Sequence, residues 1–465
     1  DGTFTPPLGR YDTLRRNADG SFDLTPQRTS SRLHFGPDGS LLFMVDEYGN
    51  QINLSYDVNG RLQRVEDMAG SGRFFDVYWG ADGRISTIQD SAGRQVNYAY
   101  SSSGVLTDVT DPLGRTSTYS YVAGKYVPLL AAARDPWSRL LTAVTYDPQD
   151  RVTSYTENGE RYSYVFNYQG NPAKTAKMDS AGNACVYTHS GGGLVTTDVA
   201  PGGLSSQATS YYPDGSIQLV TDELCVTTNY TYVTAGRPLS ITVDYLGADA
   251  VRFDYSYDAV FPNRLASITP RTPSSGLPDP SWQSWRYDYH PLGSPAPGAL
   301  RHIYRLHSDL LTVNTVATNA YDSRGRLLNE TDGLGATTDY LYDSSGNLVQ
   351  ITLPANNISG QRPQITYSHN AVGRRTSATD PLGQTTLYGF DGLGRITSMT
   401  RPSPSATPSL SFSEVTTYDV LDPATGLLFA STFDANGHVR QAGSDQFGRT
   451  VREVDTANNM TEYAY

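Results

Sequence analysis

Lysine is the residue that this sequence most clearly lacks. The chain has 35 basic side chains among 465 residues, and only Lys125, Lys174 and Lys177 are lysines. It has no basic cluster, and its formal net charge is −12 at pH 7. Because nucleic acids and anionic membranes attract clustered positive charge, we expect neither as a partner. The arginines, unlike lysines, lie flat on aromatic rings, which suits stacking between strands.

Long apolar runs and cysteines are also scarce. The longest apolar run, Val127 to Ala133, is too short to cross a bilayer, so no membrane span is expected. The chain opens at Asp1 without a signal-like segment, and we interpret it as a soluble piece of a longer polypeptide. Cys185 and Cys225 have no metal-like spacing and occupy different positions of the repeat described below. This favours two free thiols over a disulfide.

Turn-forming residues and tyrosine are abundant instead. The chain contains 43 glycines, 27 prolines and 33 tyrosines, against 14 phenylalanines and 5 methionines. Such a composition is typical of many short strands joined by tight turns. The sequence therefore predicts an all-β fold.

A repeat of about 21 residues runs along the chain. A glycine is followed by an aspartate at +7, aromatic residues at +15 and +17, and the next glycine at +21. Clear examples are Gly83, Asp90, Tyr98, Tyr100 and Gly104; Gly325, Asp332, Tyr340, Tyr342 and Gly346; and Gly373, Asp380, Tyr388, Phe390 and Gly394.

Each repeat predicts two turns and two strands. In turns such as Asp111 to Gly114, the aspartate can accept backbone hydrogen bonds, and the glycine supplies a conformation that other residues resist. The two aromatic residues share a face, because side chains alternate along a strand. Leu106 and Val109, at +2 and +5, would lie on opposite faces of a regular strand. This indicates either a β-bulge or a sheet covered on both sides.

One hairpin cannot bury its own apolar face, so the repeats should stack into a continuous sheet that curls as a spiral or shell. We predict this array over residues 1–260 and again over 312–465. Between them, residues 261–311 lose the repeat and are expected to form an irregular insert, rich in proline and tryptophan, that leaves the sheet as a loop. A shorter linker-like bulge is expected at 401–408.

The motifs Tyr-Asp-x-x-Gly-Arg-Leu, at Tyr56 to Leu62 and Tyr321 to Leu327, and Asp-Pro-Leu-Gly-Arg-Thr, at Asp111 to Thr116, closely resemble the Rhs/YD-repeat family. This family includes bacterial polymorphic toxins, the B and C components of insecticidal toxin complexes, and teneurins. The resemblance implies a hollow β-cocoon that encloses a C-terminal toxic polypeptide in the toxins and serves cell-surface recognition in teneurins. No self-cleavage core is found here, so release of a cargo by autoproteolysis is not assigned.

The candidate chemistry is sparse. Paired aspartates would suit a glycosidase, but nearly all of them occupy turn positions. His290, His302, His307 and Asp309 carry the side chains of a zinc or acid-base site, yet their spacing matches no ligand motif. We therefore expect no catalytic residue, no metal site and no cofactor.

The strongest candidate ligand surface is aromatic and lies in the expected insert: Trp282, Trp285, Tyr287 and Tyr289. Such side chains either stack on sugar rings or pack onto the sheet. We predict a non-catalytic shell or scaffold, secreted or at the cell surface, that encloses or displays its own C-terminal cargo. The alternative is an adhesion module that binds surface glycans or proteins through these aromatic residues. A carbohydrate-active or metal-dependent enzyme ranks last.

Overall fold

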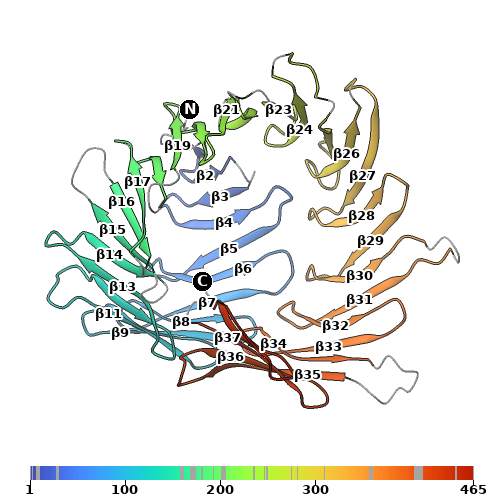
Figure 1. Cartoon of the computed structure of the whole chain (residues 1–465). Coiled ribbons are helices and arrows are strands. Elements are labelled where there is room, and N and C mark those ends of the chain that lie inside the picture. The colour runs from blue at the N-terminus through green and yellow to red at the C-terminus, as the bar shows by residue number, and fades with distance from the viewer. Residues whose placement is uncertain are drawn as a thin grey trace. The chain divides into compact units, whose positions relative to one another are not determined.

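The computed structural model consists of β-strands joined by turns (Figure 1). It describes residues 2, 4–6, 11–27, 31–157, 162–167, 174–179, 182–191, 193–200, 206–233, 236–245, 247, 250–273, 275–279, 281–307, 309–355, 360–402, 412–445 and 448–463. The all-β fold predicted from composition is confirmed. Most of the linker expected at 401–408 lies outside the described residues.

The chain divides into two compact units, each built from two separate stretches of sequence. Unit 1 comprises residues 1–72, 171–173 and 186–364, and unit 2 comprises residues 73–170, 174–185 and 365–465. Neither unit follows the predicted boundaries at residues 260 and 311, and that three-part division stays a prediction.

The strands of unit 1 fall before and after the first stretch of unit 2. They are β1 Thr13–Arg16, β2 Phe22–Thr25, β3 Arg32–Phe35, β4 Leu41–Val45, β5 Gln51–Tyr56, β6 Leu62–Asp67, most of β17 Ala184–His189, β18 Val195–Val199, β19 Ser206–Tyr211, β20 Ile217–Thr221, β21 Thr227–Val233, β22 Arg237–Val243, β23 Val251–Tyr257, β24 Leu265–Arg271, β25 Ser284–Tyr289, β26 Leu300–Leu306, β27 Val313–Tyr321, β28 Leu327–Asp332, β29 Thr337–Tyr342 and β30 Leu348–Thr352.

Unit 2 holds the remaining strands. They are β7 Phe74–Trp79, β8 Ile85–Asp90, β9 Gln95–Tyr100, β10 Leu106–Thr110, β11 Thr116–Tyr121, β12 Leu130–Arg134, β13 Leu140–Tyr146, β14 Val152–Glu157, β15 Tyr162–Asn167, β16 Lys174–Asp179, β31 Gln364–His369, β32 Arg375–Thr379, β33 Thr385–Phe390, β34 Ile396–Arg401, β35 Phe412–Leu421, β36 Leu428–Phe433, β37 Val439–Ser444, β38 Thr450–Val454 and β39 Met460–Glu462. In both units, consecutive strands pair antiparallel, as in β8 with β9 and β28 with β29.

The aspartate of each repeat organises its turn. Asp90 Oδ1 accepts hydrogen bonds from the backbone N–H groups of Ala92 at 3.0 Å and Arg94 at 2.9 Å, and Arg94 Nε donates to Asp90 Oδ2 at 2.7 Å. Gly93 has a φ of 79°, a value that favours glycine. The same two backbone hydrogen bonds recur at Asp111, Asp332 and Asp380.

A β-bulge explains the spacing of the apolar residues at +2 and +5. In the pairing of β9 with β10, Tyr100 lies opposite Leu106 and Ala99 lies opposite Asp108, so Thr107 is an extra residue. The bulge restores Leu106 and Val109 to one face. Equivalent register shifts occur where β5 pairs with β6, β7 with β8 and β29 with β30. Of the two alternatives left open by the sequence, the structure shows the bulge.

The second tyrosine of a repeat fastens its strand to the preceding one. Tyr100 Oη donates a hydrogen bond to the Ile85 carbonyl oxygen at 2.9 Å, and Tyr56 Oη donates to the Leu41 carbonyl oxygen at 2.8 Å. The same bond is made by Tyr146, Tyr211, Tyr257, Tyr289 and Tyr418. An arginine lies over the ring in several repeats, with Arg326 4.8 Å from the Tyr342 centroid. The predicted stacking of arginine on tyrosine is therefore present.

Residues 261–311 do not leave the sheet, contrary to the expectation of a loop excursion. They contain β24, β25 and β26, which pair with one another and with β23 and β27. The proline-rich stretch begins in β24 and continues into the long turn before β25, which is described at 272–273, 275–279 and 281–283. Sequence reasoning missed these strands because the longer turns shift the spacing of the repeat, whereas Tyr287 and Tyr289 keep the aromatic pair.

Candidate functional site

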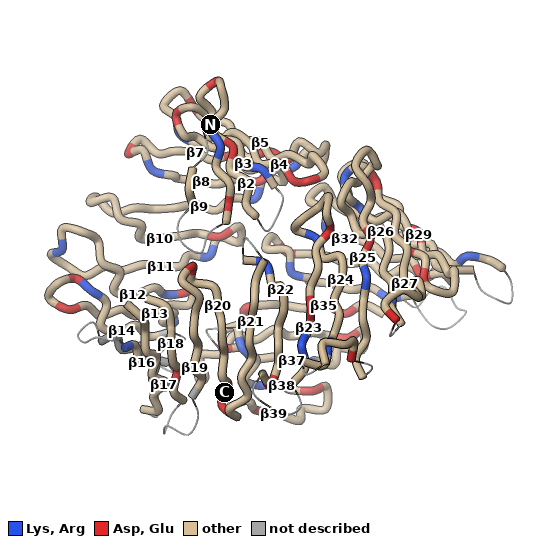
Figure 2. Tube along the Cα trace, turned by 90° about the horizontal axis from the view of Figure 1, so that it is seen from above, with Lys and Arg blue, Asp and Glu red and all other residues tan. Residues whose placement is uncertain are grey.

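The strand ends form two rims within each unit, because consecutive strands are antiparallel. We call the turns that follow even-numbered strands the even rim, and the turns that follow odd-numbered strands the odd rim. Turns of one rim bind turns of the other that lie more than 200 residues away in sequence. We call these contacts the seam. Acidic and basic residues are interspersed along the chain trace (Figure 2).

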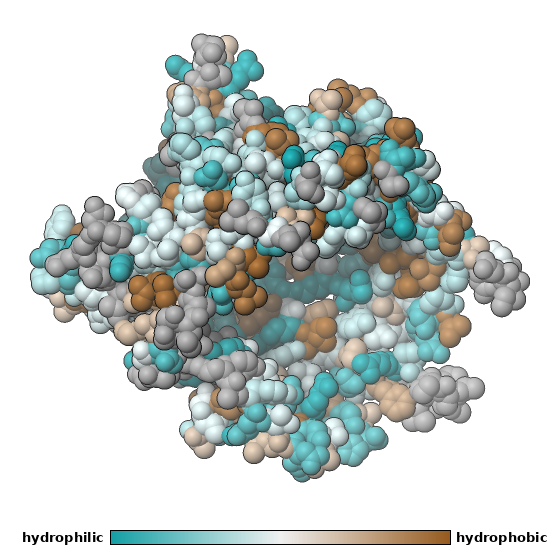
Figure 3. All heavy atoms as spheres, turned by 45° about the horizontal axis from the view of Figure 1, so that its top comes forward, coloured by the Kyte–Doolittle hydropathy of each residue, from teal (hydrophilic) through white to brown (hydrophobic). Residues whose placement is uncertain are grey.

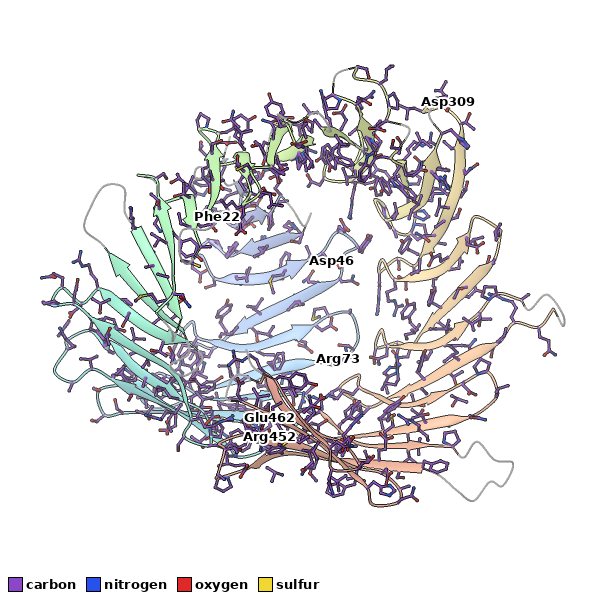
Figure 4. The ribbon with its side chains drawn as sticks, in the orientation of Figure 1. Phe22, Asp46, Arg73, Asp309, Arg452 and Glu462 are labelled. Atoms are coloured by element: carbon purple, nitrogen blue, oxygen red, sulfur yellow. The ribbon has the colours of Figure 1, made fainter. Side chains whose placement is uncertain are left out.

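In unit 1 the even-rim turn between β4 and β5 makes the seam. Figure 4 labels Asp46 at the start of this turn. Glu47 forms an ion pair with Arg264, and Asn50 Nδ2 donates to the Arg324 carbonyl oxygen at 3.1 Å. The Tyr48 ring lies against Gly325, where a Cβ atom would be only 2.4 Å from it. A side chain at Gly325 would therefore force this contact apart.

A second seam contact of unit 1 involves Tyr11. Its Oη donates a hydrogen bond to Asp214 Oδ2 at 2.5 Å, in the odd-rim turn between β19 and β20. The hydrogen bond to the Asp214 carboxylate is the main reason that the pKa of Tyr11 is raised. The Tyr11 ring also fills the space beside Gly236. The first strands of the chain are thus tied to strands two hundred residues later.

In unit 2 the seam is centred on Asp419. Asp419 Oδ2 accepts hydrogen bonds from Arg115, in the even-rim turn between β10 and β11, and from Arg395 Nη1 at 2.6 Å. Arg115 and Arg395 also pair with Asp111 and Asp391 of their own turns. The Asp419 side chain is 21% exposed and its backbone φ is 63°. One carboxylate therefore links turns that are about 280 residues apart, from residue 115 to residue 395.

Other groups extend this seam. Arg94 Nη1 donates to the Gly392 carbonyl oxygen at 3.4 Å, and Arg139 Nη1 donates to that of Gly426 at 3.2 Å. Leu113 packs against Gly392, where a Cβ atom would lie 3.0 Å from Leu113 Cδ2. The seam of unit 2 thus combines ion pairs, backbone hydrogen bonds and apolar contact.

Unit 1 contains a tyrosine-lined cavity of about 380 Å³ beside its seam. It is lined by Tyr48, Asn263, Arg264, Leu265, Tyr287, Tyr289, Ala299, Leu300 and Tyr321. Burial, with the nearby Glu47 carboxylate, raises the pKa of Tyr48 to about 12, and burial raises that of Tyr289 to about 12. The hydroxyl groups of Tyr48 and Tyr289 therefore stay protonated at physiological pH. The faces of these rings can stack on a sugar ring.

The four aromatic residues predicted as a ligand surface have different surroundings. Tyr287 and Tyr289 line this cavity, whereas Trp282 is 52% exposed and packs edge-on against Phe253, with centroids 5.6 Å apart. Trp285 lies in β25 opposite Ile268. The structure thus brings two of the four together and adds Tyr48, from the turn between β4 and β5, and Tyr321, from the end of β27. Sequence reasoning missed both because they come from other elements of the chain.

The histidines proposed for acid-base or metal chemistry are His290, directly after β25, His302, within β26, and His307, directly after β26. His302 lies in β26, and burial lowers its pKa. Asp309 organises the turn between β26 and β27 by accepting hydrogen bonds from Leu311 and Thr312 (Figure 4). Among the residues that the structure describes, no group of three histidine, cysteine or acidic side chains is placed to hold a metal ion.

Two sequence-based expectations concern cysteine pairing and membrane spans. Cys185 and Cys225 are free thiols, as predicted, and Cys225 is exposed with a φ of 63°. Within the described part of the chain, there is no helix of the length and apolar character that crossing a bilayer requires. Apolar and polar side chains are mixed on the face shown in Figure 3.

Comparisons with known proteins agree with the repeat. A family model described as RHS Repeat matches residues 321–358 and 369–406. The comparison with curated proteins gave no match. The crystal structure of TcdB2-TccC3-TEV is 14% identical, with a TM-score of 0.49; the match covers 100% of this chain and 29% of that one. The structure of the Tc holotoxin pore of Photorhabdus luminescens is also 14% identical, with a TM-score of 0.44; the match covers 100% of this chain and 29% of that one.

The chain thus spans less than a third of the length of these two structures. The family model covers two segments, and the turn that it matches at Asp322 and Asp391 recurs with the same hydrogen bonds at Asp57, Asp90 and Asp111. The chain therefore carries RHS repeats at residues 321–358 and 369–406, and the turn of these repeats recurs elsewhere in it.

Proposed function

We propose that this chain is a structural wall: a non-catalytic shell or scaffold segment of a longer, secreted or surface protein. It would enclose or display another part of that polypeptide, with a C-terminal toxin-like cargo as the first candidate. The seam is the observation that carries this proposal. A sheet whose turns bind its own distant turns becomes a continuous surface, and such a surface suits separation of one space from another.

Several features support a scaffold over a catalyst. The aspartates of the repeat are engaged in turn hydrogen bonds, and the arginines pair with them or stack on tyrosines. Carboxylates held this way by an adjacent guanidinium have lowered pKa values, as at Asp57, where the Arg61 hydrogen bonds bring it to about 2. A general acid needs the opposite shift.

Small-angle X-ray scattering tests the proposal that this chain forms a structural wall. A hollow or strongly curved sheet gives a pair-distance maximum at longer distances than a solid particle of 50.6 kDa. The Asp419→Ala variant should broaden that distribution, because the seam of unit 2 loses its central carboxylate. Asp422→Ala is the matched control, since this turn aspartate bonds within its own turn. A profile that fits a solid globule would contradict the proposal.

A second candidate is glycan binding, and the tyrosine-lined cavity is the observation that favours it. Its rings and the Arg264 guanidinium offer stacking faces and donors of the kind that bind sugars. A glycan array is the test. Binding that is lost in Tyr287→Ala but kept in Trp285→Ala would place the ligand in the cavity, whereas a blank array would remove this candidate.

A further inference from the structure

The tyrosine-lined cavity and the seam of unit 1 share residues. Tyr48 lines the cavity and also packs on Gly325 in the seam. Arg264 lines the cavity and also forms the seam ion pair with Glu47. Side chains that would contact a ligand in this cavity therefore also hold distant turns of the chain together.

Asn263 adds a third contact of this kind. Its Nδ2 donates a hydrogen bond to the Gln27 carbonyl oxygen at 2.6 Å, from the turn between β23 and β24 to the turn between β2 and β3. The two residues are 236 positions apart, so this hydrogen bond belongs to the seam. Three of the nine residues that line the cavity thus make seam contacts.

The cavity is complete only when the seam of unit 1 is closed. Tyr48 comes from the turn between β4 and β5, whereas the other eight lining residues lie between residues 263 and 321. If the seam opened, Tyr48 would move away and the cavity would lose one of its rings. A ligand that contacts both Tyr48 and Tyr287 binds the closed form better than the open form, and therefore stabilises closure.

The lining of the cavity favours a neutral ligand with rings and hydroxyl groups. Its volume of about 380 Å³ is near the lower end of the range for small-molecule sites, about 300–1,000 Å³. The charge of Arg264 is balanced by Glu47, so the site has no excess charge to attract an ion. Tyrosine faces stack on sugar rings, and the Tyr287 hydroxyl can donate and accept hydrogen bonds. A neutral disaccharide has this chemistry.

We infer that a neutral disaccharide binds in the tyrosine-lined cavity and holds the seam of unit 1 closed. The inference rests on the glycan-binding candidate of the proposed function, and it adds that binding and closure are coupled. A bound sugar favours the closed seam, and the closed seam favours sugar binding. Closure of unit 1 then depends on the concentration of a ligand.

Hydrogen exchange with and without sugar measures this coupling. The probes are maltose, lactose, cellobiose and trehalose, each added at about ten times the Kd that isothermal titration calorimetry gives for it. Exchange of the backbone amides at 46–50 and 322–326 should slow about tenfold, because the sugar suppresses opening by the factor 1 + [L]/Kd. Residues 322–326 lie outside the lining of the cavity, so the sugar does not shield them directly. The turn at 434–438 in unit 2 is the internal control and should not change.

Tyr48→Ala tests whether the coupling passes through this ring. The variant removes the only lining residue from the early stretch of the chain, so a bound sugar should no longer slow exchange at 322–326. Tyr245→Ala is the matched control, since Tyr245 is a half-exposed tyrosine in another even-rim turn of unit 1, and it should keep the full effect. Circular dichroism and thermal unfolding confirm that each variant is folded.

The outcomes separate the coupling from glycan binding itself. If a sugar binds and slows exchange only at 263–265 and 287–289, the glycan-binding candidate stands and the coupling to the seam is overturned. A slowing at 322–326 that persists in Tyr48→Ala would also overturn the coupling, because the sugar would then act by another route. If none of the four sugars binds, the inference is wrong, and the glycan array decides separately whether the cavity binds any glycan.

Discussion

At the scale of single residues, the aspartate turns and the tyrosine hydroxyls hold the sheet together. Few apolar side chains of the described residues are buried, and the largest of these, Leu306, Leu428 and Phe429, are still 8–9% exposed. Most strand side chains are half-buried, so the apolar contribution per residue is smaller than in a globular core. Polar contacts at the rims therefore contribute a large share of the stability.

The first prediction concerns the stability of the fold at acid pH. The Arg61 hydrogen bonds lower the pKa of Asp57 to about 2, and the Thr312 hydrogen bonds lower that of Asp309 to about 2. Because the folded pKa lies below the unfolded value of about 3.9, the stabilisation is complete above that value and is lost as pH falls toward 2. Urea unfolding at pH 7, 4, 3 and 2 should show this loss.

Asp57→Asn is the control for that experiment. It keeps a side-chain acceptor for the Asn59 and Arg61 backbone N–H groups but cannot titrate. The free energy of unfolding of this variant should depend less on pH between 4 and 2 than that of the unmodified protein. Equal pH dependence in both proteins would show that this turn aspartate does not contribute to acid sensitivity.

The second prediction isolates the tyrosine hydroxyl. Tyr100→Phe removes the hydrogen bond to the Ile85 carbonyl oxygen but keeps the ring under Arg84. The expected cost is about 1 kcal/mol in the free energy of unfolding. Tyr98→Phe is the control, and its effect should be smaller. Chemical unfolding monitored by fluorescence measures the free energy of unfolding of both variants. Equal losses in the two variants would contradict this prediction.

At the scale of the element, the unit of stability is a hairpin with its neighbours. Within a unit, a strand bonds to the strand before it and the strand after it, as β29 does with β28 and β30. In such an array, stability is a sum of local terms and contacts between neighbours. Damage to one hairpin should therefore open a limited region first.

The third prediction compares two changes in one hairpin. Tyr340→Ala removes a half-buried ring from β29 and should cost on the order of 2 kcal/mol, below the value for a fully buried aromatic residue. Asp332→Ala removes two turn hydrogen bonds and should cost on the order of 1 kcal/mol. Hydrogen exchange should show protection lost near each site, and more for the tyrosine. Loss spread evenly over the chain would indicate one cooperative unit instead.

At the scale of the whole molecule, the seam couples stretches of sequence that are far apart. Each unit combines an early and a late stretch of the chain, so neither stretch forms its unit alone. Ion pairs of this kind are partly exposed, and solvent screening reduces their strength. Their contribution is therefore best measured as a coupling between two side chains.

The fourth prediction measures this coupling in unit 2. In a double-mutant cycle of Arg115→Met and Asp419→Asn, the coupling free energy should be about 1 kcal/mol, since both side chains are roughly one-fifth exposed. The cycle of Arg115→Met with Asp422→Asn is the control and should give no coupling. A seam cycle that also gives none would remove Asp419 as the link between these turns.

The sequence by itself determined the local structure, because local structure depends on residues a few positions apart. The spacing of Asp90, Gly93 and Tyr100 predicted the strands and the turns, and the scarcity of lysine pointed to arginine stacked on tyrosine. The excess of tyrosine over phenylalanine was the available signal for the hydroxyl bonds to Ile85 and Leu41, but composition does not name the acceptor.

Only the tertiary structure decided the bulge, the strands within 261–311 and the seam. The bulge and a two-sided sheet give the same spacing of Leu106 and Val109, so the strand pairing was needed to separate them. The contacts of Glu47 with Arg264 and of Arg115 with Asp419 depend on how far the sheet curls over hundreds of residues. A small twist per strand sets that curl, and its sum over many strands, not any local motif, determines which turns meet.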